Sequence, residues 1–76
     1  MFLDRITVDP ERMNGRPCVR DLRVTVATVL GQLAAGQTRE QILADYPYLE
    51  DEDITASLEY GAARVSEREV QVARPA

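Results

Sequence analysis

Hydrophobic and polar residues follow two different rhythms along this chain, and the first of them predicts strands. In residues 4–10, DRITVDP, Ile6 and Val8 alternate with polar neighbours, as they do in a half-buried strand. Cys18 and Val19 predict a second strand, separated from the first by a loop in which Asn14-Gly15 favours positive φ. The N-terminal part of the chain is therefore expected to form a short β-hairpin.

After Thr25, apolar residues recur at the spacing of a helix. The first helix is predicted from Val26 to Ala35, with Thr25 as its N-cap and Gly36 just past its end. Residues at helical spacing give this helix one apolar face, which is expected to point inward. That face consists of Val26, Val29, Leu30, Leu33 and Ala34.

Two more helices are predicted. The second spans Arg39–Asp45, where Thr38 caps the start and Gln41 stands at the capping-box position, before Tyr46-Pro47 ends it. The third spans Asp51–Ser66 and carries two apolar stripes, which indicates two neighbours. The inner stripe is Ile54, Leu58, Gly61 and Val65, and the thinner one is Ala56, Tyr60 and Ala63.

These elements predict a mainly α, helix-turn-helix-like domain of three helices with a short N-terminal β-hairpin. Residues 1–66 are expected to form this single domain and residues 67–76 a C-terminal tail. Periodicity leaves two possibilities for the tail. Either the tail continues the third helix, or the helix ends and Val70 and Val72 alternate with polar residues in an extended segment.

The size of the chain favours self-association. A single core in 76 residues rarely supplies more than about 3–5 kcal/mol unaided. Cys18 is the only cysteine and histidine is absent, so neither an internal disulfide nor a Cys/His zinc site is available as a support. We therefore expect a homodimer. The charged N-terminus, the lone thiol and the lack of a long apolar run predict a cytoplasmic protein without a membrane span.

The net charge of −4 is unevenly distributed. Residues 1–24 carry five arginines and four acids, whereas residues 40–69 carry nine acids and only Arg64 and Arg68 as bases. Affinity for nucleic acid comes mainly from neutralising phosphates, so the second half is poorly suited to duplex DNA. A protein partner with a basic surface suits it better.

Four consecutive acids, Glu50, Asp51, Glu52 and Asp53, open the third helix. They could hold a hard cation, but calcium loops place their ligands at alternate positions and need a glycine for the turn. Carboxylates in the first turn also stabilise the positive end of a helix, by roughly 0.3–1 kcal/mol each. The second interpretation predicts capping and solubility, and no metal site.

A group of arginines surrounds the predicted hairpin loop, and its role is open. The side chains could grip phosphate or a partner's carboxylates through bidentate hydrogen bonds. They could equally form a solvated face in which Arg20 or Arg23 pairs locally with Asp9 or Asp21. The group consists of Arg12, Arg16, Arg20 and Arg23.

The sequence offers no recognisable set of catalytic residues. It contains no histidine, its one cysteine lies in an apolar strand context, and no serine stands in a nucleophile elbow. We therefore predict no catalytic residue and no cofactor, and a binding module rather than an enzyme.

Nearly the whole chain resembles the bacterial and archaeal family called domain of unknown function 433. The matching segments are DRITVDP, NGRPCVRDLRVTV and LAAGQTREQILADYPYLEDEDITASLEYGA. The resemblance implies a homeodomain-like fold and a role as an antitoxin, similar to VapB-type proteins, that binds and silences a PIN-like ribonuclease toxin. Asp21-Leu22 replaces the family's usual Gly-Thr, which indicates a possible difference in partner choice.

This resemblance suggests which residues would contact each part of the nuclease. The acidic start of the third helix, residues 50–53, would cover a basic RNA-binding surface of the nuclease. Arg64, Arg68 or the tail with Val70 and Val72 would reach its metal-binding carboxylates, so deletion of residues 67–76 should abolish inhibition. The alternative function is a dimeric, DNA-binding autorepressor whose N-terminal arginines face the phosphates of its operator.

Overall fold

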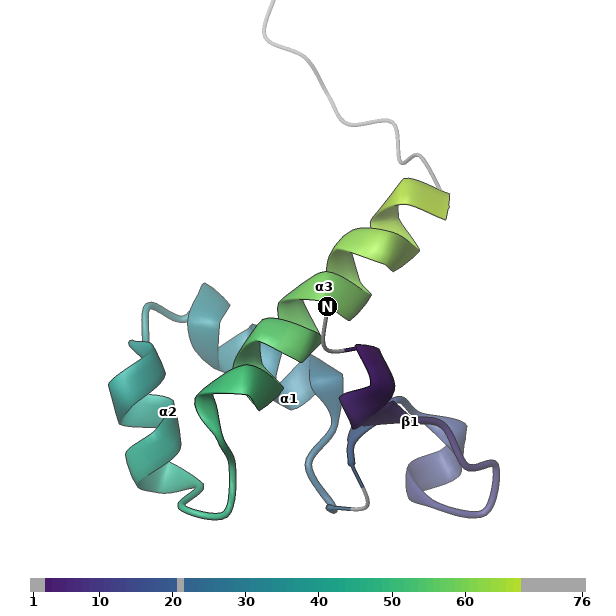
Figure 1. Cartoon of the computed structure of the whole chain (residues 1–76), viewed down its shortest axis with the longest axis horizontal. Helices are drawn as coiled ribbons and strands as arrows, with labels where there is room; N and C mark the ends of the chain where they lie inside the picture. The colour runs from purple at the N-terminus through teal and green to yellow at the C-terminus, as the bar shows by residue number, and fades with distance from the viewer. Residues whose placement is uncertain (1–2, 21, 68–76) are drawn as a thin grey trace, which may run out of the picture.

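The computed structural model describes residues 3–20 and 22–67 of the chain. Figure 1 shows α3 crossing the middle of the domain, with α2 on one side of it and the N-terminal hairpin on the other. In chain order the elements are the 3₁₀ turn η1 (Leu3–Arg5), β1 (Ile6–Thr7), the turn η2 (Met13–Gly15), β2 (Cys18–Val19), α1 (Val26–Ala34), α2 (Arg39–Asp45) and α3 (Asp51–Glu67).

The predicted hairpin is present. β1 and β2 pair antiparallel, with Ile6 opposite Val19 and Thr7 opposite Cys18. The loop between them turns through three successive residues with positive φ, namely Met13 at 53°, Asn14 at 58° and Gly15 at 77°. Asn and Gly adopt this conformation readily, whereas a residue such as Met does so at a cost of roughly 1–2 kcal/mol.

The first helix begins and ends where local signals place it. The Thr25 side chain accepts a hydrogen bond from the Thr28 backbone N–H, which caps the start. At the other end Gly36, at φ 94°, donates its N–H to Leu33 and Gln37 donates to Gln32. This pair of bonds is a Schellman motif, and glycine is favoured there because the position needs a left-handed backbone.

The second and third helices also keep close to their predicted bounds. Thr38 and Gln41 form the complete capping box at the start of α2, in which each side chain accepts a hydrogen bond from the other residue's backbone N–H. α2 matches the predicted range, and α3 extends one residue further than predicted. A mainly α domain of three helices with an N-terminal β-hairpin is thus confirmed.

The core lies where α1, α2 and α3 meet the second strand. Its buried members come from β2, the three helices and the segments before α1 and α3, and Leu22, Leu33, Leu43 and Tyr46 pack against them half-buried. At Gly61, an added Cβ would lie 3.1 Å from Cδ1 of Leu30, so the glycine allows α1 to pack closely on α3. The cluster is Val19, Val24, Val29, Ile42, Leu49 and Ile54.

Two parts of the predicted inner faces are wrong. On α3, Leu58 and Val65 are 42% and 68% exposed, while Asp53 and Ser57 are fully buried beside Ile54. On α1, Ala34 is exposed. The buried face of α3 thus includes Asp53, and Figure 1 shows that the second half of the helix projects beyond the other elements.

Candidate functional site

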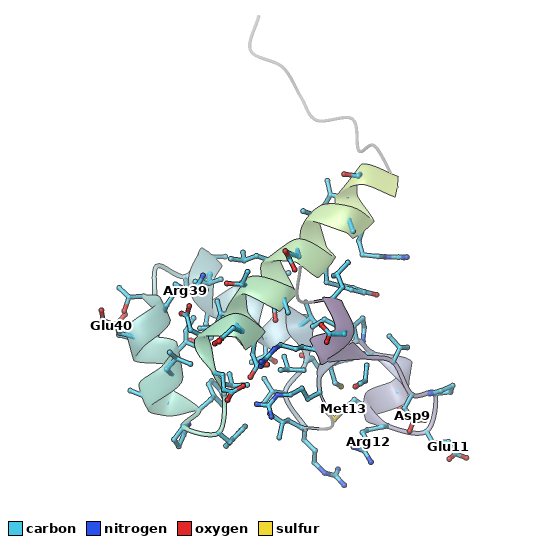
Figure 2. The ribbon with its side chains drawn as sticks, viewed as in Figure 1. Asp9, Glu11, Arg12, Met13, Arg39 and Glu40 are labelled. Atoms are coloured by element: carbon cyan, nitrogen blue, oxygen red, sulfur yellow. The ribbon has the colours of Figure 1, made fainter. Side chains whose placement is uncertain are left out.

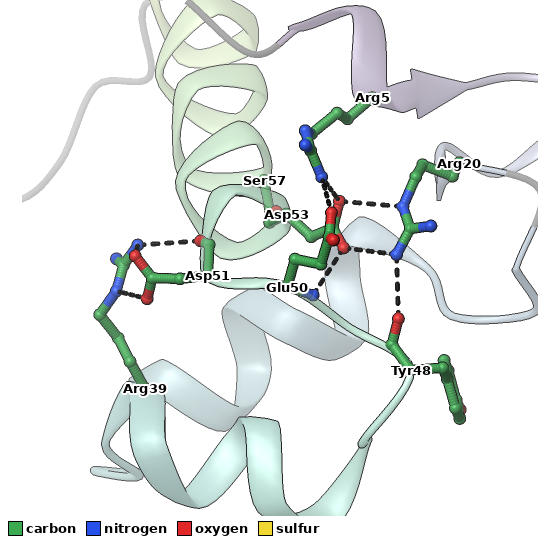
Figure 3. Close-up of polar contacts among 8 residues, drawn as sticks. All are labelled: Arg5, Arg20, Arg39, Tyr48, Glu50, Asp51, Asp53 and Ser57. Carbon is green, nitrogen blue, oxygen red and sulfur yellow. Dashed lines mark hydrogen bonds and ion pairs between the residues drawn. The ribbon is translucent and has the colours of Figure 1, made fainter.

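A buried carboxylate organises the best-defined polar cluster of the domain. Asp53, in the first turn of α3, is completely buried and accepts hydrogen bonds from two arginines and one backbone N–H. Arg5 Nη1 lies 2.9 Å from Oδ1, while Arg20 donates from Nε to Oδ1 at 3.1 Å and from Nη2 to Oδ2 at 2.7 Å. The Glu50 N–H donates to Oδ2 at 2.8 Å, so both oxygens are fully used (Figure 3).

The two arginines reach Asp53 because the hairpin places them side by side. The Arg20 backbone N–H donates to the Arg5 carbonyl at 2.5 Å, and the Thr7 hydroxyl donates to the Arg20 carbonyl. Arg20 follows β2 with a positive φ of 48°, which turns the chain away from the strand. Its Nη2 also donates to the Tyr48 carbonyl at 2.9 Å, so one side chain joins the hairpin, the α2–α3 turn and α3.

The same contacts determine the charge state of the cluster. Burial raises the pKa of Asp53, but the hydrogen bonds from Arg20, the Glu50 backbone and Arg5 outweigh it, so the pKa lies below its ordinary value. Bonds to Glu50 and Asp53 raise the pKa of Arg5, and a bond to Asp53 raises that of Arg20. Asp53 is therefore an ionised structural anchor, and it cannot touch a partner while the domain is folded.

A second, exposed ion pair joins α2 to the start of α3. Arg39 donates from Nε to Asp51 Oδ1 at 2.8 Å and from Nη2 to Thr55 Oγ1 at 2.5 Å. The hydrogen bond from Arg39 lowers the pKa of Asp51. Both side chains keep much of their surface, with 37% exposure for Arg39 and 59% for Asp51. This pair therefore fixes the helices more weakly than the Asp53 cluster does.

The acidic run at the start of α3 is thus divided between structure and surface. Asp53 is buried, and Glu50 pairs with Arg5 at 2.7 Å but stays 57% exposed. Asp51 pairs with Arg39, and Glu52 is exposed. Three of the four predicted partner-binding acids consequently remain at the surface. Glu40 and Asp45 on α2 are exposed as well, and we call the five exposed acids of α2 and the start of α3 the acidic surface, namely Glu40, Asp45, Glu50, Asp51 and Glu52.

The arginine group around the hairpin is not a single cluster. Arg20 points to Asp53, whereas Asp21, one of the two acids considered as a local partner, lies outside the described residues. Asp9 instead accepts a hydrogen bond from the Glu11 N–H inside the loop. Figure 2 shows Arg12 in this loop, at the end of the domain opposite Arg39 and Glu40 of α2. Arg16 and Arg23 are exposed.

A hollow with apolar walls lies between α1 and the second half of α3. Its volume is about 300 Å³, and among the described residues Arg64 is the only charged one that lines it. Val65 forms part of its wall and is 68% exposed. The remaining lining residues are Pro17, Val26, Ala27, Leu30, Tyr60 and Gly61. We call this feature the α1–α3 groove.

The other predicted site residues, Arg68, Val70 and Val72, lie outside the described residues. Within residues 3–20 and 22–67, no three acidic or thiol side chains are grouped as a metal site requires. In the same part of the chain, no helix combines the length and the apolar character needed to cross a membrane.

The fold and this cluster define a small helical domain that an arginine–aspartate network fastens at the start of its longest helix. The chain matches the family model described as "Protein of unknown function (DUF433)" over residues 6–61, and it belongs to this family. It is similar to the crystal structure of a DUF433 member protein from Anabaena variabilis ATCC 29413, with 27% sequence identity and a TM-score of 0.77. That similarity covers 83% of this chain and 62% of the other. No curated protein matches the sequence.

Sequence reasoning missed the role of Arg5 and the burial of Asp53. A signal for Asp53 was available, because it stands three residues after Glu50, where a side chain can accept the N-cap N–H. It also shares the helical face of Ile54 and Ser57. No comparable signal exists for Arg5, whose partner lies 48 residues further along the chain.

Proposed function

We propose that this protein is the non-catalytic antitoxin of a type II toxin–antitoxin pair, and that it binds and neutralises a PIN-like ribonuclease in the cytoplasm. The acidic surface on α2 and the start of α3 carries the proposal. Its carboxylates stay exposed after three arginines have been bound within the chain. The resemblance to VapB-type antitoxins supplies the class of partner.

Electrostatics explains why such a surface suits a ribonuclease. An enzyme that binds RNA presents basic groups to the phosphates, and a protein that offers carboxylates instead competes for the same groups. Complementary charge also speeds diffusional encounter. Glu50 directly precedes α3, Asp51 and Glu52 lie in its first turn, and the Asp53 cluster holds this end of the helix in place.

Arg64 and the tail have the second role in this proposal. Arg64 lies in the part of α3 that projects from the domain, one helical turn before the end of the described helix. A guanidinium there, together with Arg68, would approach the metal-binding carboxylates of the nuclease. Residues of the tail, including Val70 and Val72, would order on the nuclease as they bind.

The test is an inhibition assay with a purified PIN-like ribonuclease, to be sought first among the products of the neighbouring genes. The full chain should form a stable complex with it and stop RNA cleavage. Glu52→Arg should weaken the complex by about tenfold or more, equivalent to about 1.4 kcal/mol, because it reverses a charge in the middle of the acidic surface. Glu11→Arg makes the same change in the exposed β1–β2 loop and should leave affinity within about twofold of the wild type.

Two results would contradict the proposal. One is an active ribonuclease in the presence of excess wild-type chain. The other is an equal effect of the two charge reversals, which would show that net charge acts rather than this surface. Binding should also weaken as salt is raised, because exposed charges are screened.

A DNA-binding autorepressor is the second candidate, and the exposure of Arg16 and Arg23 on the hairpin side favours it. The start of α3, which enters the major groove in helix-turn-helix proteins, is acidic here and opposes the usual docking. Fluorescence anisotropy with the duplex upstream of the gene, at rising salt, distinguishes the two candidates. Tight binding by the protein alone with a steep salt dependence would support repression.

A further inference from the structure

We propose that Asn14, in the loop between β1 and β2, is a site of spontaneous deamidation that the folded hairpin keeps unreactive until the loop opens. Deamidation converts the side-chain amide into a carboxylate, so the loop would gain a negative charge only after it has opened. The inference concerns the hairpin loop and does not depend on the ribonuclease.

The sequence supplies the reactive pair. Asn14 is the only asparagine of the chain, and Gly15 follows it directly. In deamidation the backbone nitrogen of the following residue attacks Cγ of the asparagine, and a glycine hinders this approach least because it has no side chain. Asparagine is accordingly one of the thermolabile residues of proteins. The Asn14 side chain is exposed, so water reaches it.

The reaction has two steps and needs no co-reactant except water. First, the Gly15 nitrogen loses its proton and bonds to Cγ of Asn14, and the side-chain nitrogen leaves with a proton as ammonia. The product is a five-membered succinimide ring. Water then adds to one of the two ring carbonyls and the C–N bond at that carbon breaks. Hydrolysis at Cγ gives aspartate, and hydrolysis at the backbone carbonyl gives isoaspartate, in which the chain continues through Cγ.

The native backbone of Asn14 is far from the geometry of ring closure. Its φ is 58° and its ψ is 32°. The Gly15 nitrogen must come next to Cβ, which happens at a ψ of about −120°, because Cβ stands about 120° from the backbone nitrogen around the Cα–C bond. From the native ψ of 32°, the peptide would have to turn through about 150°. Such a ψ lies outside the main allowed regions, so the chain reaches it only briefly.

Two backbone hydrogen bonds hold the loop in its native geometry. The Gly15 N–H donates to the Arg12 carbonyl at 3.0 Å, and the Arg16 N–H donates to the Met13 carbonyl at 3.1 Å. The nitrogen that would attack is therefore engaged as a donor, and its bond must break before the peptide can turn. The reaction rate should thus follow the fraction of molecules in which the loop is open.

Met13 is the weak point of this loop. It adopts a φ of 53°, which a side chain with a Cβ atom disfavours. Asn14 and Gly15 adopt positive φ more readily. The residue at position 13 therefore sets how often the loop opens, and a substitution there should change the deamidation rate without touching the reacting atoms.

Deamidation would change both the charge and the shape of the loop. The net charge of −4 would become one unit more negative, with the new carboxylate two residues from both Arg12 and Arg16. Isoaspartate also adds one carbon atom to the backbone, so the two hydrogen bonds of the loop could not reform with the same geometry. Both changes would lower the affinity of these arginines for phosphate.

Intact-mass spectrometry of the full chain, stored at neutral pH either in buffer or in concentrated guanidinium chloride, tests the proposal. Peptide mapping then separates aspartate from isoaspartate. The wild type should deamidate at Asn14 in denaturant, and more slowly by about tenfold or more in buffer, because hydrogen bonds of the loop must break first. Asn14→Gln is the control for the glutamines of the chain and should show no comparable mass change in either condition.

Two substitutions at Met13 test the role of loop opening. Met13→Val should accelerate the reaction several-fold in buffer, because a β-branched residue disfavours positive φ more strongly, and Met13→Gly should slow it. All three chains should react alike in denaturant. Circular dichroism verifies that each variant is folded, and the wild type in the two conditions decides where one is not.

Three results would overturn the proposal. Absence of deamidation in denaturant would show that Asn14 is not a reactive site. Equal rates for the wild type in buffer and in denaturant would show that the fold does not protect it. Equal rates in buffer for the folded wild type, Met13→Val and Met13→Gly would show that opening of this loop does not control the reaction.

Discussion

Replacing Asp53 by Asn is the most direct test of the arginine–aspartate cluster. The change keeps the shape of the side chain but removes its charge and one of its two acceptor oxygens. In the native cluster these oxygens accept four hydrogen bonds, from Arg5, from Arg20 twice and from the Glu50 N–H. In the variant an amide NH₂ group would face donors, so at least one of these groups loses its acceptor.

The expected change in the free energy of unfolding follows from the burial of Asp53 and its partners. Hydrogen bonds to charged groups contribute about 1.5–3 kcal/mol each, and breaking a fully buried ion pair costs about 3–5 kcal/mol. The side chains of Arg5 and Arg20 keep 25% and 37% exposure, so water can replace part of what they lose. We therefore expect Asp53→Asn to lower the free energy of unfolding by about 2–3 kcal/mol, a large fraction of what a domain of this size has.

Urea denaturation followed by far-UV circular dichroism measures this change. With an m-value near 1 kcal/mol/M, the transition midpoint should fall by roughly 2–3 M. Protein concentrations must be matched, because self-association of the chain would add to the apparent stability.

Asp45→Asn is the control, since it makes the same chemical change at an exposed position of α2. It should alter stability by no more than about 0.5 kcal/mol. If Asp53→Asn also stays within about 0.5 kcal/mol of the wild type, Asp53 does not fasten the hairpin to α3, and the structural role assigned to it is wrong.

Four further predictions concern Asp53, the cap of α2, the ion pair of Arg39 and the C-terminal tail. The lowered pKa of Asp53 makes its contribution fully present above about pH 4 and lost as the pH falls through the folded-state value, so urea midpoints should drop in acid, and less steeply for Asp53→Asn. Thr38→Ala removes the capping box of α2 and should cost about 1 kcal/mol in the same assay. Arg39→Gln should destabilise the fold less than Asp53→Asn does, because its ion pair is exposed; an equal or larger loss would contradict this ranking. Removing residues 67–76 should abolish inhibition of the ribonuclease and leave the circular dichroism spectrum of the domain unchanged in shape; full inhibition would exclude the tail from the mechanism.

The predictions that the structure confirms concern interactions between residues close together in the sequence. Thr25, Thr38 and Gly36 located the helix ends because a cap or a Schellman motif involves residues within one turn of each other. The Asn14-Gly15 pair located the hairpin loop in the same way, since positive φ is a property of the residue itself. The family resemblance added a fold class, which the structure bears out in its three helices and its hairpin.

The sequence by itself therefore determined which segments form the three helices, to within a residue at their ends, and how charge is divided between the two halves of the chain. Only the tertiary structure decided which acid is buried, which arginines meet it and which apolar residues of α3 stay exposed. Arg5 and Asp53 lie 48 residues apart, and no local pattern records that the hairpin brings them together. The physical reason is that burial belongs to the packed assembly of elements. The same helical spacing places Ile54 and Val65 on one face of α3, but neighbouring elements cover Ile54 and leave Val65 exposed.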